Sequence, residues 1–130
     1  MVPVKSFMVP REKFVTIERD TDAQTAAQIM RDRGIGSLFV TNGKEIVGIL
    51  TDTDMVRRVV AGGVDTHKTT AEQIMSAPIV TIEEDKTVLD ANDLMAKTHI
   101  RHLGVTQGGK VVGMISVRDI VVFLTNLPRK

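Results

Sequence analysis

Apolar and polar positions follow the same order of spacings in both halves of the chain. Short apolar runs predict three strands in each half, at 14–17, 37–41 and 45–51 and again at 79–82, 102–106 and 110–116. After the first strand of each half, apolar residues recur three and four positions apart, which predicts a helix of about a dozen residues. Asn-Gly and Gly-Gly pairs between the last two strands predict hairpins. A closing helix is then expected in each half, at 52–61 and 118–127.

The two halves are copies of one unit. A shift of 65 residues places VTIERD (15–20) on VTIEED (80–85) and continues without a gap as far as Asp54 and Asp119. The chain is therefore a tandem duplication of a β-α-β-β-α unit. We expect repeat 1 at about 4–61, a polar, glycine-rich linker at 62–70 and repeat 2 at about 71–127.

The predicted fold class is α/β (α+β), with both repeats in one domain that spans residues 1–130. A unit this small has one apolar sheet face that must be covered, so the two repeats are expected to pack about a pseudo-twofold axis. Asp20 or Thr21 is expected to begin the helix of the first repeat, and Asp85 is expected to cap that of the second.

One short motif stands at the same place in both repeats, as GILTDTDMV (48–56) and GMISVRDIV (113–121). In one interpretation, Thr51 or Ser116 caps a helix and Asp54 or Asp119 bonds back to it as a capping box. That interpretation leaves open why a glycine opens the motif in both copies, at Gly48 and at Gly113.

In the other interpretation the motif is a ligand site. A strand that runs directly into a helix leaves free backbone N–H groups, which favour an anion. The Thr or Ser hydroxyl adds a donor, and the Asp suits the two hydroxyls of a ribose better than it suits a phosphate. The glycine would leave room for a ligand beside the backbone. The spacing therefore favours a nucleoside phosphate over a bare anion.

The duplicated unit with its G-h-h-T/S-x-x-D motif resembles the CBS domain, named after cystathionine β-synthase, and the chain looks like a stand-alone tandem pair. The resemblance implies a regulatory or energy-sensing module that binds AMP, ADP or ATP, or S-adenosylmethionine, in clefts between the repeats. It also implies these nucleotide-binding residues: Asp54 and Asp119 for the ribose, Thr51 and Ser116 for ribose or phosphate, and Val15 with Ile35 and Val80 with Ile100 for the adenine.

The two clefts are expected to differ in charge. Repeat 2 has Arg101 and His102 where repeat 1 has uncharged residues, and Arg118 precedes its motif aspartate. In the CBS domains that the chain resembles, basic residues at the Arg101 and His102 positions often contact phosphate. The resemblance therefore implies that the cleft of repeat 2 prefers the more highly phosphorylated ligand. The alternative for Arg101 is a solvated residue at a strand end.

Composition removes several other functions. The net charge is +1, Trp and Tyr are absent, and nucleic acid is therefore not expected as a partner. The absence of cysteine excludes disulfides and thiolate chemistry and is compatible with a cytoplasmic protein. No apolar run is long enough to span a bilayer, and no signal peptide is expected. His99 and His102 lack a third ligand nearby, so no metal site is predicted.

No catalytic motif is visible, so we expect a binding protein and not an enzyme. The resemblance further implies a homodimer, as a flat disc of four repeats, that signals to a regulated partner protein. Two alternatives stay open: an interaction module whose clefts hold no ligand, and an enzyme with unrecognised chemistry on the same scaffold.

Overall fold

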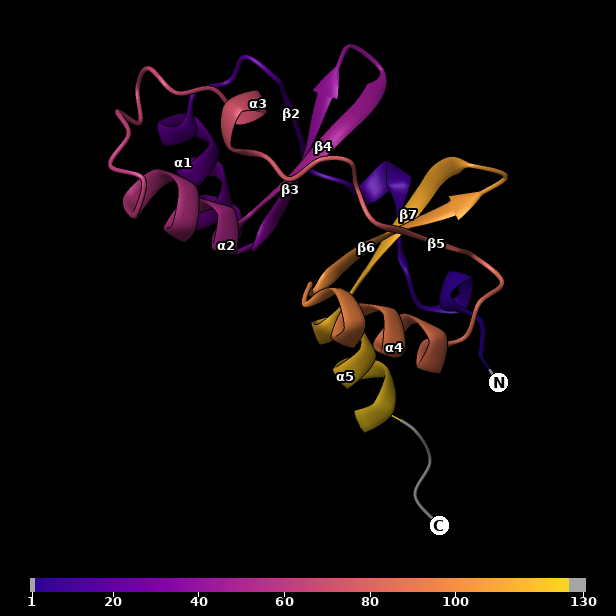
Figure 1. Cartoon of the computed structure of the whole chain (residues 1–130). Coiled ribbons are helices and arrows are strands. Elements are labelled where there is room, and N and C mark those ends of the chain that lie inside the picture. The colour runs from indigo at the N-terminus through magenta and orange to yellow at the C-terminus, as the bar shows by residue number, and fades with distance from the viewer. Residues whose placement is uncertain (1, 127–130) are drawn as a thin grey trace. The chain divides into compact units, whose positions relative to one another are not determined.

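The computed structural model describes residues 2–126 and divides into two compact units (Figure 1). The first unit is Phe14–Ile79. The second unit combines the described parts of Met1–Lys13 and Val80–Lys130. The expected end of the last helix at residue 127 lies outside the described residues. Each unit has its own apolar core.

The first unit contains a three-stranded sheet. Its elements are β2 (Thr16–Glu18), α1 (Ala23–Arg33), β3 (Ser37–Asn42), β4 (Glu45–Thr51), α2 (Asp52–Asp54), the π-helix η3 (Met55–Val60) and α3 (Ala71–Ile74). β2 is parallel to β3, and β3 is antiparallel to β4. A parallel pair needs a crossover, which α1 supplies, so the predicted β-α-β-β-α order is confirmed.

The second unit repeats this order and adds a strand. Its elements are η1 (Val4–Ser6), β1 (Val9–Pro10), η2 (Arg11–Lys13), β5 (Thr81–Glu83), α4 (Val88–Thr98), β6 (His102–Gln107), β7 (Lys110–Ser116) and α5 (Val117–Thr125). The strand order is β1-β7-β6-β5, with β5 parallel to β6. α4 and α5 lie side by side (Figure 1).

Equivalent residues form the two cores. Leu38, Val40 and Leu50 are completely buried in the first unit, as are their counterparts Leu103, Val105 and Ile115 in the second. Each helix covers its sheet with small residues and one methionine: Ala23, Ala26 and Met30 on α1, and Val88, Ala91 and Met95 on α4. Full burial of one such aliphatic side chain contributes roughly 1.5–3 kcal/mol. The duplication therefore conserves the core positions.

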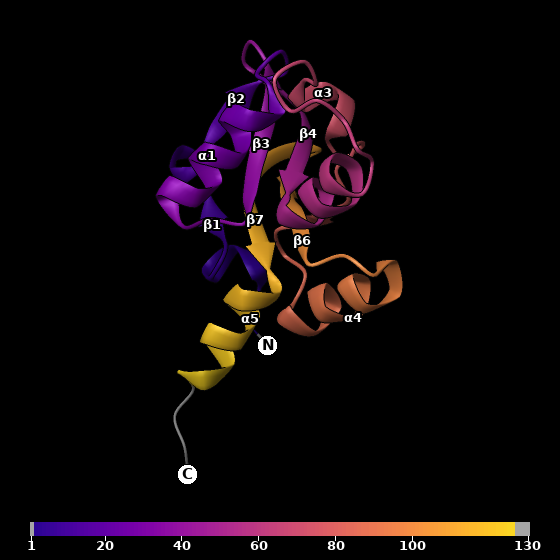
Figure 2. The same ribbon diagram turned by 90° about the vertical axis from the view of Figure 1, so that its left-hand side faces the viewer.

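Each unit is completed by a segment that stands before the other repeat in the sequence. β1 precedes the first repeat's strands but pairs with β7 of the second unit, Val9 opposite Met114. α3 opens repeat 2 in the sequence but belongs to the first unit, where Ala71 and Ile74 are buried. α3 lies beside β4 (Figure 2). Beyond α3, Ser76 forms a bridge with Ile49 of β4. The compact units are therefore not the sequence ranges 4–61 and 71–127, and the pseudo-twofold packing stays a prediction.

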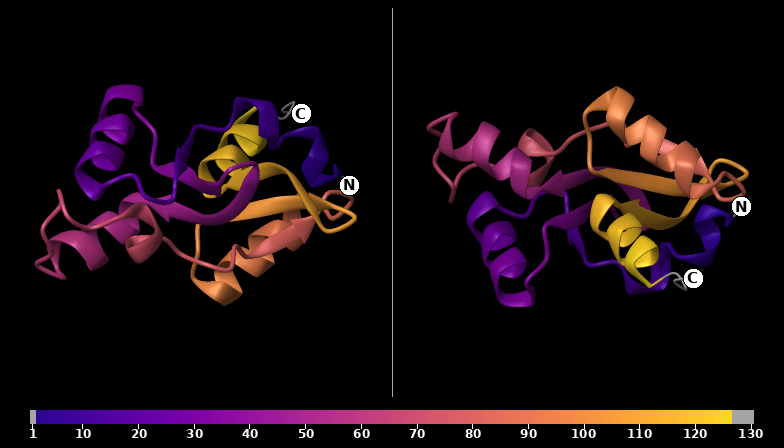
Figure 3. Two further views of the ribbon diagram at one scale, coloured as in Figure 1. Left: turned by 90° about the horizontal axis from the view of Figure 1, so that it is seen from above. Right: turned by 90° about the horizontal axis from the view of Figure 1, so that it is seen from below.

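Both views of Figure 3 show the N-terminal segment, residues 2–13, beside β7 and α5 of its own unit. Phe7 of this segment stacks on Phe123 of α5, with ring centroids 4.8 Å apart. Val4 is completely buried in the same core. The N-terminal segment is therefore part of the second unit's core and of its surface near α5.

The predicted helix caps are wrong in both repeats. Asp22, and not Asp20 or Thr21, caps α1, because its carboxylate accepts a hydrogen bond from the backbone N–H of Thr25 at 2.7 Å. Thr87, and not Asp85, caps α4 through a reciprocal bond pair with the residue three positions on. Asp85 instead pairs with a lysine of the N-terminal segment. In both cases the cap is the residue whose side chain accepts a hydrogen bond from the backbone N–H three positions on, a group that has no partner within the helix.

The two closing helices differ in backbone geometry. α5 is a regular α-helix, but in the first unit α2 passes after three residues into the π-helix η3, where the N–H of Ala61 bonds to the carbonyl of Val56, five residues back. Val59 of η3 is 4% exposed, whereas its counterpart Leu124 on α5 is 52% exposed. A π-helical turn is wider than an α-helical turn and often marks a specialised position.

Candidate functional site

Both copies of the motif form capping boxes. The backbone N–H of Thr51 donates to Oδ2 of Asp54 at 2.9 Å, and the N–H of Asp54 donates to the Thr51 hydroxyl. Ser116 and Asp119 exchange the same pair of bonds, with the Ser116 N–H 2.8 Å from Oδ2 of Asp119. The capping interpretation of the sequence is confirmed, and T-x-x-D alone does not indicate a ligand.

The two motif glycines have a packing role. A Cβ at Gly113 would lie 2.9 Å from Cγ of Met8 and 2.9 Å from the carbonyl oxygen of Val9. A Cβ at Gly48 would meet Cγ of Met75 at the same distance. These atoms belong to two crossing segments, residues 8–9 before β2 and residues 75–76 after α3. The crossing segments fill the space that we expected a ligand to use, so the ligand interpretation of these glycines is wrong.

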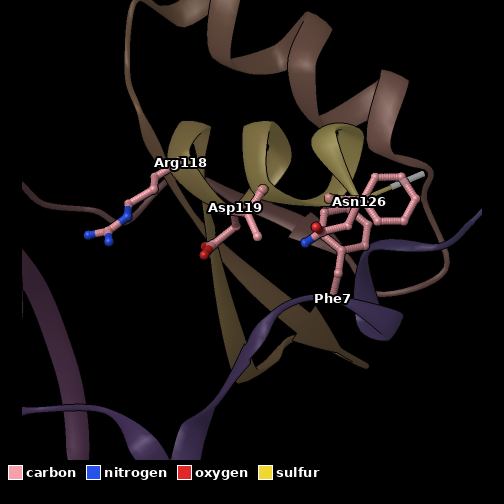
Figure 4. Close-up of a pocket in the computed structure, with 6 residues that line it drawn as sticks. Phe7, Arg118, Asp119 and Asn126 are labelled. Carbon is pink, nitrogen blue, oxygen red and sulfur yellow. The ribbon is translucent and has the colours of Figure 1, made fainter. Parts of the chain in front are cut away.

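Asp119 lines a pocket of about 350 Å³ in the second unit (Figure 4). The other lining residues are Phe7, Arg118, Val122, Phe123 and Asn126. Among the described residues, the contacts made with the Asp119 carboxylate are those of Ser116, and both reach Oδ2. Oδ1 is left available to a ligand. A carboxylate with one free oxygen can accept hydrogen bonds from a pair of hydroxyls.

Positive charge lies beside this carboxylate. In Figure 4 the Arg118 side chain extends on one side of Asp119, while Phe7 and Asn126 lie on the other. The start of α5 is next to Arg101, whose carbonyl accepts from the N–H of Val117 at 3.0 Å. The Arg101 side chain is exposed, and His102 is half-buried on β6. An arginine at a helix N-terminus favours an anionic group there.

Asp54 has a different environment. It is 6% exposed, and its Oδ1 accepts a hydrogen bond from the hydroxyl of Ser76 at 2.8 Å. Nε of Arg58 lies 3.7 Å from the same oxygen, and Nη1 of Arg58 donates to the carbonyl of Met75 at 2.7 Å. Because Oδ2 belongs to the capping box, both oxygens of Asp54 are already engaged within the first unit.

The predicted adenine-contacting residues are divided between the units. Val15 and Ile35 are half-buried against the first core, and Ile100 is half-buried against the second. Val80 is 38% exposed. Val80 and Ile100 are not among the residues that line the Asp119 pocket, so the adenine contacts stay a prediction.

Four pocket residues were not predicted from the sequence: Phe7, Val122, Phe123 and Asn126. The repeat alignment does contain one signal, since Phe123 and Asn126 correspond to Arg58 and Ala61, which differ in kind. Phe7 could not be found in this way, because it reaches the pocket only through the exchange of segments between the units.

Within residues 2–126, no helix has the length and apolar character needed to cross a membrane. The same residues contain no cluster of three or more His, Asp or Glu side chains placed to hold a metal ion.

Similar proteins come from archaea, bacteria and plants. The chain is 37% identical over 115 residues to an uncharacterised protein of Methanopyrus kandleri, covering 87% of this chain and 59% of that protein. It is 30% identical to the CBS domain-containing protein YhcV of Bacillus subtilis, covering 82% of this chain and 76% of that one. A crystal structure from Pyrococcus horikoshii has a TM-score of 0.88 at 25% identity, covering 99% of this chain and 96% of the other.

A further structural neighbour was solved with a ligand. CBSX2 in complex with AMP has a TM-score of 0.81, covers 99% of this chain and 100% of its own, and is 19% identical. At that identity the likeness shows the fold alone.

The family assignment follows from the match of a family model to both repeats. The model of the CBS domain matches residues 4–61 and again residues 71–126. These ranges contain both capping motifs, both cores and all the residues that line the Asp119 pocket. The chain belongs to the CBS domain family and carries two tandem copies of that domain.

Proposed function

We propose that the protein is a regulatory module that reversibly binds an adenosine-containing ligand such as AMP, ADP or ATP at its G-h-h-T/S-x-x-D motif. The observation that carries this proposal is the Asp119 pocket, where a carboxylate with a free oxygen lies between an arginine and an aromatic wall. CBSX2, a neighbour with the same fold that was solved with AMP, supports the choice of ligand.

The chemistry of the pocket suits a nucleotide. The free oxygen of Asp119 accepts hydrogen bonds from ribose hydroxyls, which are neutral donors that a carboxylate binds well. Arg118 and the positive end of the α5 helix dipole attract the phosphates. Phe7 and Phe123 supply an apolar wall for the uncharged part of the ligand. Val80, Ile100, Arg101 and His102 remain proposed contacts for base and phosphate.

Regulation would follow from a shift of population. A ligand that binds one arrangement of the protein better than another increases the share of that arrangement and so changes the surface offered to a partner protein. Family membership supports a regulatory role over a catalytic one. A module that reports the cellular adenine nucleotide or methyl-donor state to a partner fits both the pocket and the family.

The proposed homodimer is supported by exposed apolar residues on the closing helices. Val121 and Leu124 on α5 are each 52% exposed, and Val60 on η3 is 76% exposed. Apolar groups clustered on one helix are typical of an interface. We expect Val121→Asp to convert a dimer to a monomer in light scattering, because a dimer would bury the new charge.

Leu89→Asp is the matched control for the dimer. Leu89 lies on α4 and is 53% exposed, nearly the same fraction as Val121, so the two substitutions change side chains of similar exposure. The control should keep the mass of the wild type. A wild type that is monomeric at high micromolar concentration would contradict the homodimer.

The proposed function is tested by isothermal titration of AMP, ATP and S-adenosylmethionine into the wild-type protein, with GMP and inorganic phosphate as controls. We expect micromolar affinity for at least one adenosyl ligand. GMP and phosphate should bind at least tenfold more weakly, because GMP carries a different base and phosphate lacks both the base and the ribose. No heat from any ligand at two temperatures, with a folded protein, would favour an interaction module without a ligand.

A further inference from the structure

We infer that the two copies of the motif have different tasks: the Asp119 copy holds the ligand, and the Asp54 copy is closed by an internal latch made of Arg58 and Ser76. This inference rests on the proposed function and adds to it which copy binds and how many ligands one chain takes. The latch occupies the oxygen of Asp54 that a ribose would need.

The two copies differ at the latch positions themselves. Arg58 corresponds to Phe123 under the 65-residue shift. Phe123 stacks on Phe7 and carries no charge that could pair with Asp119. Ser76 pairs with Ile49 on the strand before the motif, and Val9 pairs with Met114 at the equivalent place. Valine has no hydroxyl to donate. The hydrogen-bond donor and the ion-pair partner of Oδ1 are therefore both present in one copy and replaced by apolar residues in the other.

The latch is anchored at both ends. Arg58 bonds through Nη1 to the carbonyl of Met75, the residue before Ser76, so its guanidinium joins η3 to the crossing segment. Met75 in turn packs on Gly48. A ribose that reached Asp54 would have to displace the Ser76 hydroxyl and release Arg58 from this segment. Each new hydrogen bond to the ribose would then replace an existing interaction of Asp54, so the net gain in binding free energy would be small.

Local charge also separates the copies. The first turn of α2 carries Asp52 as well as Asp54, two carboxylates within three residues. The corresponding turn of α5 has Val117 in place of Asp52, and Arg118 follows it. A phosphate is repelled at the first motif and attracted at the second.

The first test is the stoichiometry of AMP binding by isothermal titration, on the wild type and on Asp54→Ala. We expect one AMP per chain in the wild type, and the same stoichiometry with an affinity within about threefold in Asp54→Ala. Two AMP per chain in the wild type, with one lost in Asp54→Ala, would overturn the inference while supporting the proposed function. The wild-type stoichiometry decides this even if the variant does not fold.

The second test is thermal unfolding without ligand, which probes the latch whether or not AMP binds. Asp54→Ala and Asp119→Ala each remove one capping box, so the difference between them reports the bonds to Ser76 and Arg58. We expect the melting temperature to fall several degrees further for Asp54→Ala. Equal losses would overturn the latch. Absence of AMP binding to the wild type with unequal losses would instead reject the proposed function and the ligand-holding task of Asp119, and keep the latch.

Discussion

Replacing Asp119 by alanine should weaken AMP binding on the order of 100-fold, because hydrogen bonds to a charged group are each worth about 1.5–3 kcal/mol. The free oxygen of this carboxylate is the acceptor that the proposed ribose hydroxyls require. Titration of AMP into Asp119→Ala and wild-type protein measures the loss. ATP should lose affinity to a similar extent, since both ligands carry the same ribose.

Asp90→Ala controls for the loss of a helix cap. Asp90 forms with Thr87 the same capping box as Asp119 forms with Ser116, on α4 of the same unit, but it does not line the pocket. This control should bind AMP within about twofold of the wild type. Equal losses of affinity in the two variants would mean that Asp119 acts through helix stability and not through contact with the ligand.

The order of elements could be predicted because the apolar pattern is local. Each strand and helix has its own spacing, and the second copy of the sequence provided an independent check of the first. The caps at Asp22 and Thr87 were missed because several Asp and Thr residues stand near each helix start. Which of them caps depends on where the helical N–H groups begin, and the apolar pattern does not fix that to one residue.

The exchange of segments between the units could not be predicted from the repeat alignment. The alignment pairs Met8 with Met75 and identifies them as equivalent, but it does not say which sheet either residue covers. Which sheet a segment packs on, when that sheet is far away in the sequence, depends on the path of the chain in space. The same exchange brings Phe7 to the Asp119 pocket and Ser76 to Asp54.

The sequence also predicted two equivalent motif aspartates, and the structure distinguishes them. Their difference arises from the residues around them, Arg58 and Ser76 against Phe123 and Val9. A motif read as letters describes the bonds made within it, here the capping box. The remaining bonds of each carboxylate come from side chains that the motif does not contain.

Gly113→Ala should lower the free energy of unfolding by about 2 kcal/mol, because an added methyl overpacks the contact with the N-terminal segment. Its Cβ would lie 2.9 Å from Cγ of Met8 and 2.9 Å from the backbone oxygen of Val9. The Met8 side chain would have to leave its packing against the second core, and the backbone oxygen cannot move without shifting β1 from β7. Urea unfolding followed by circular dichroism measures the change.

Gly36→Ala is the matched glycine control. A Cβ at Gly36 would meet the end of the Asp52 side chain, which is exposed and can rotate. This variant should stay within about 0.5 kcal/mol of the wild type. A similar loss in both variants would mean that the effect comes from the backbone freedom of glycine and not from packing.

A double-mutant cycle with Met8→Ala identifies the contact responsible. Shortening Met8 removes the flexible part of the clash, so the double variant should be more stable than the sum of the single losses predicts, by at least about 1 kcal/mol. Additive losses would show that Met8 is not the constraint on Gly113. Because Phe7 adjoins Met8 and lines the Asp119 pocket, Gly113→Ala should also weaken AMP binding, and Met8→Ala should restore part of it. The glycine of the motif would then act on the ligand through the segment that it accommodates.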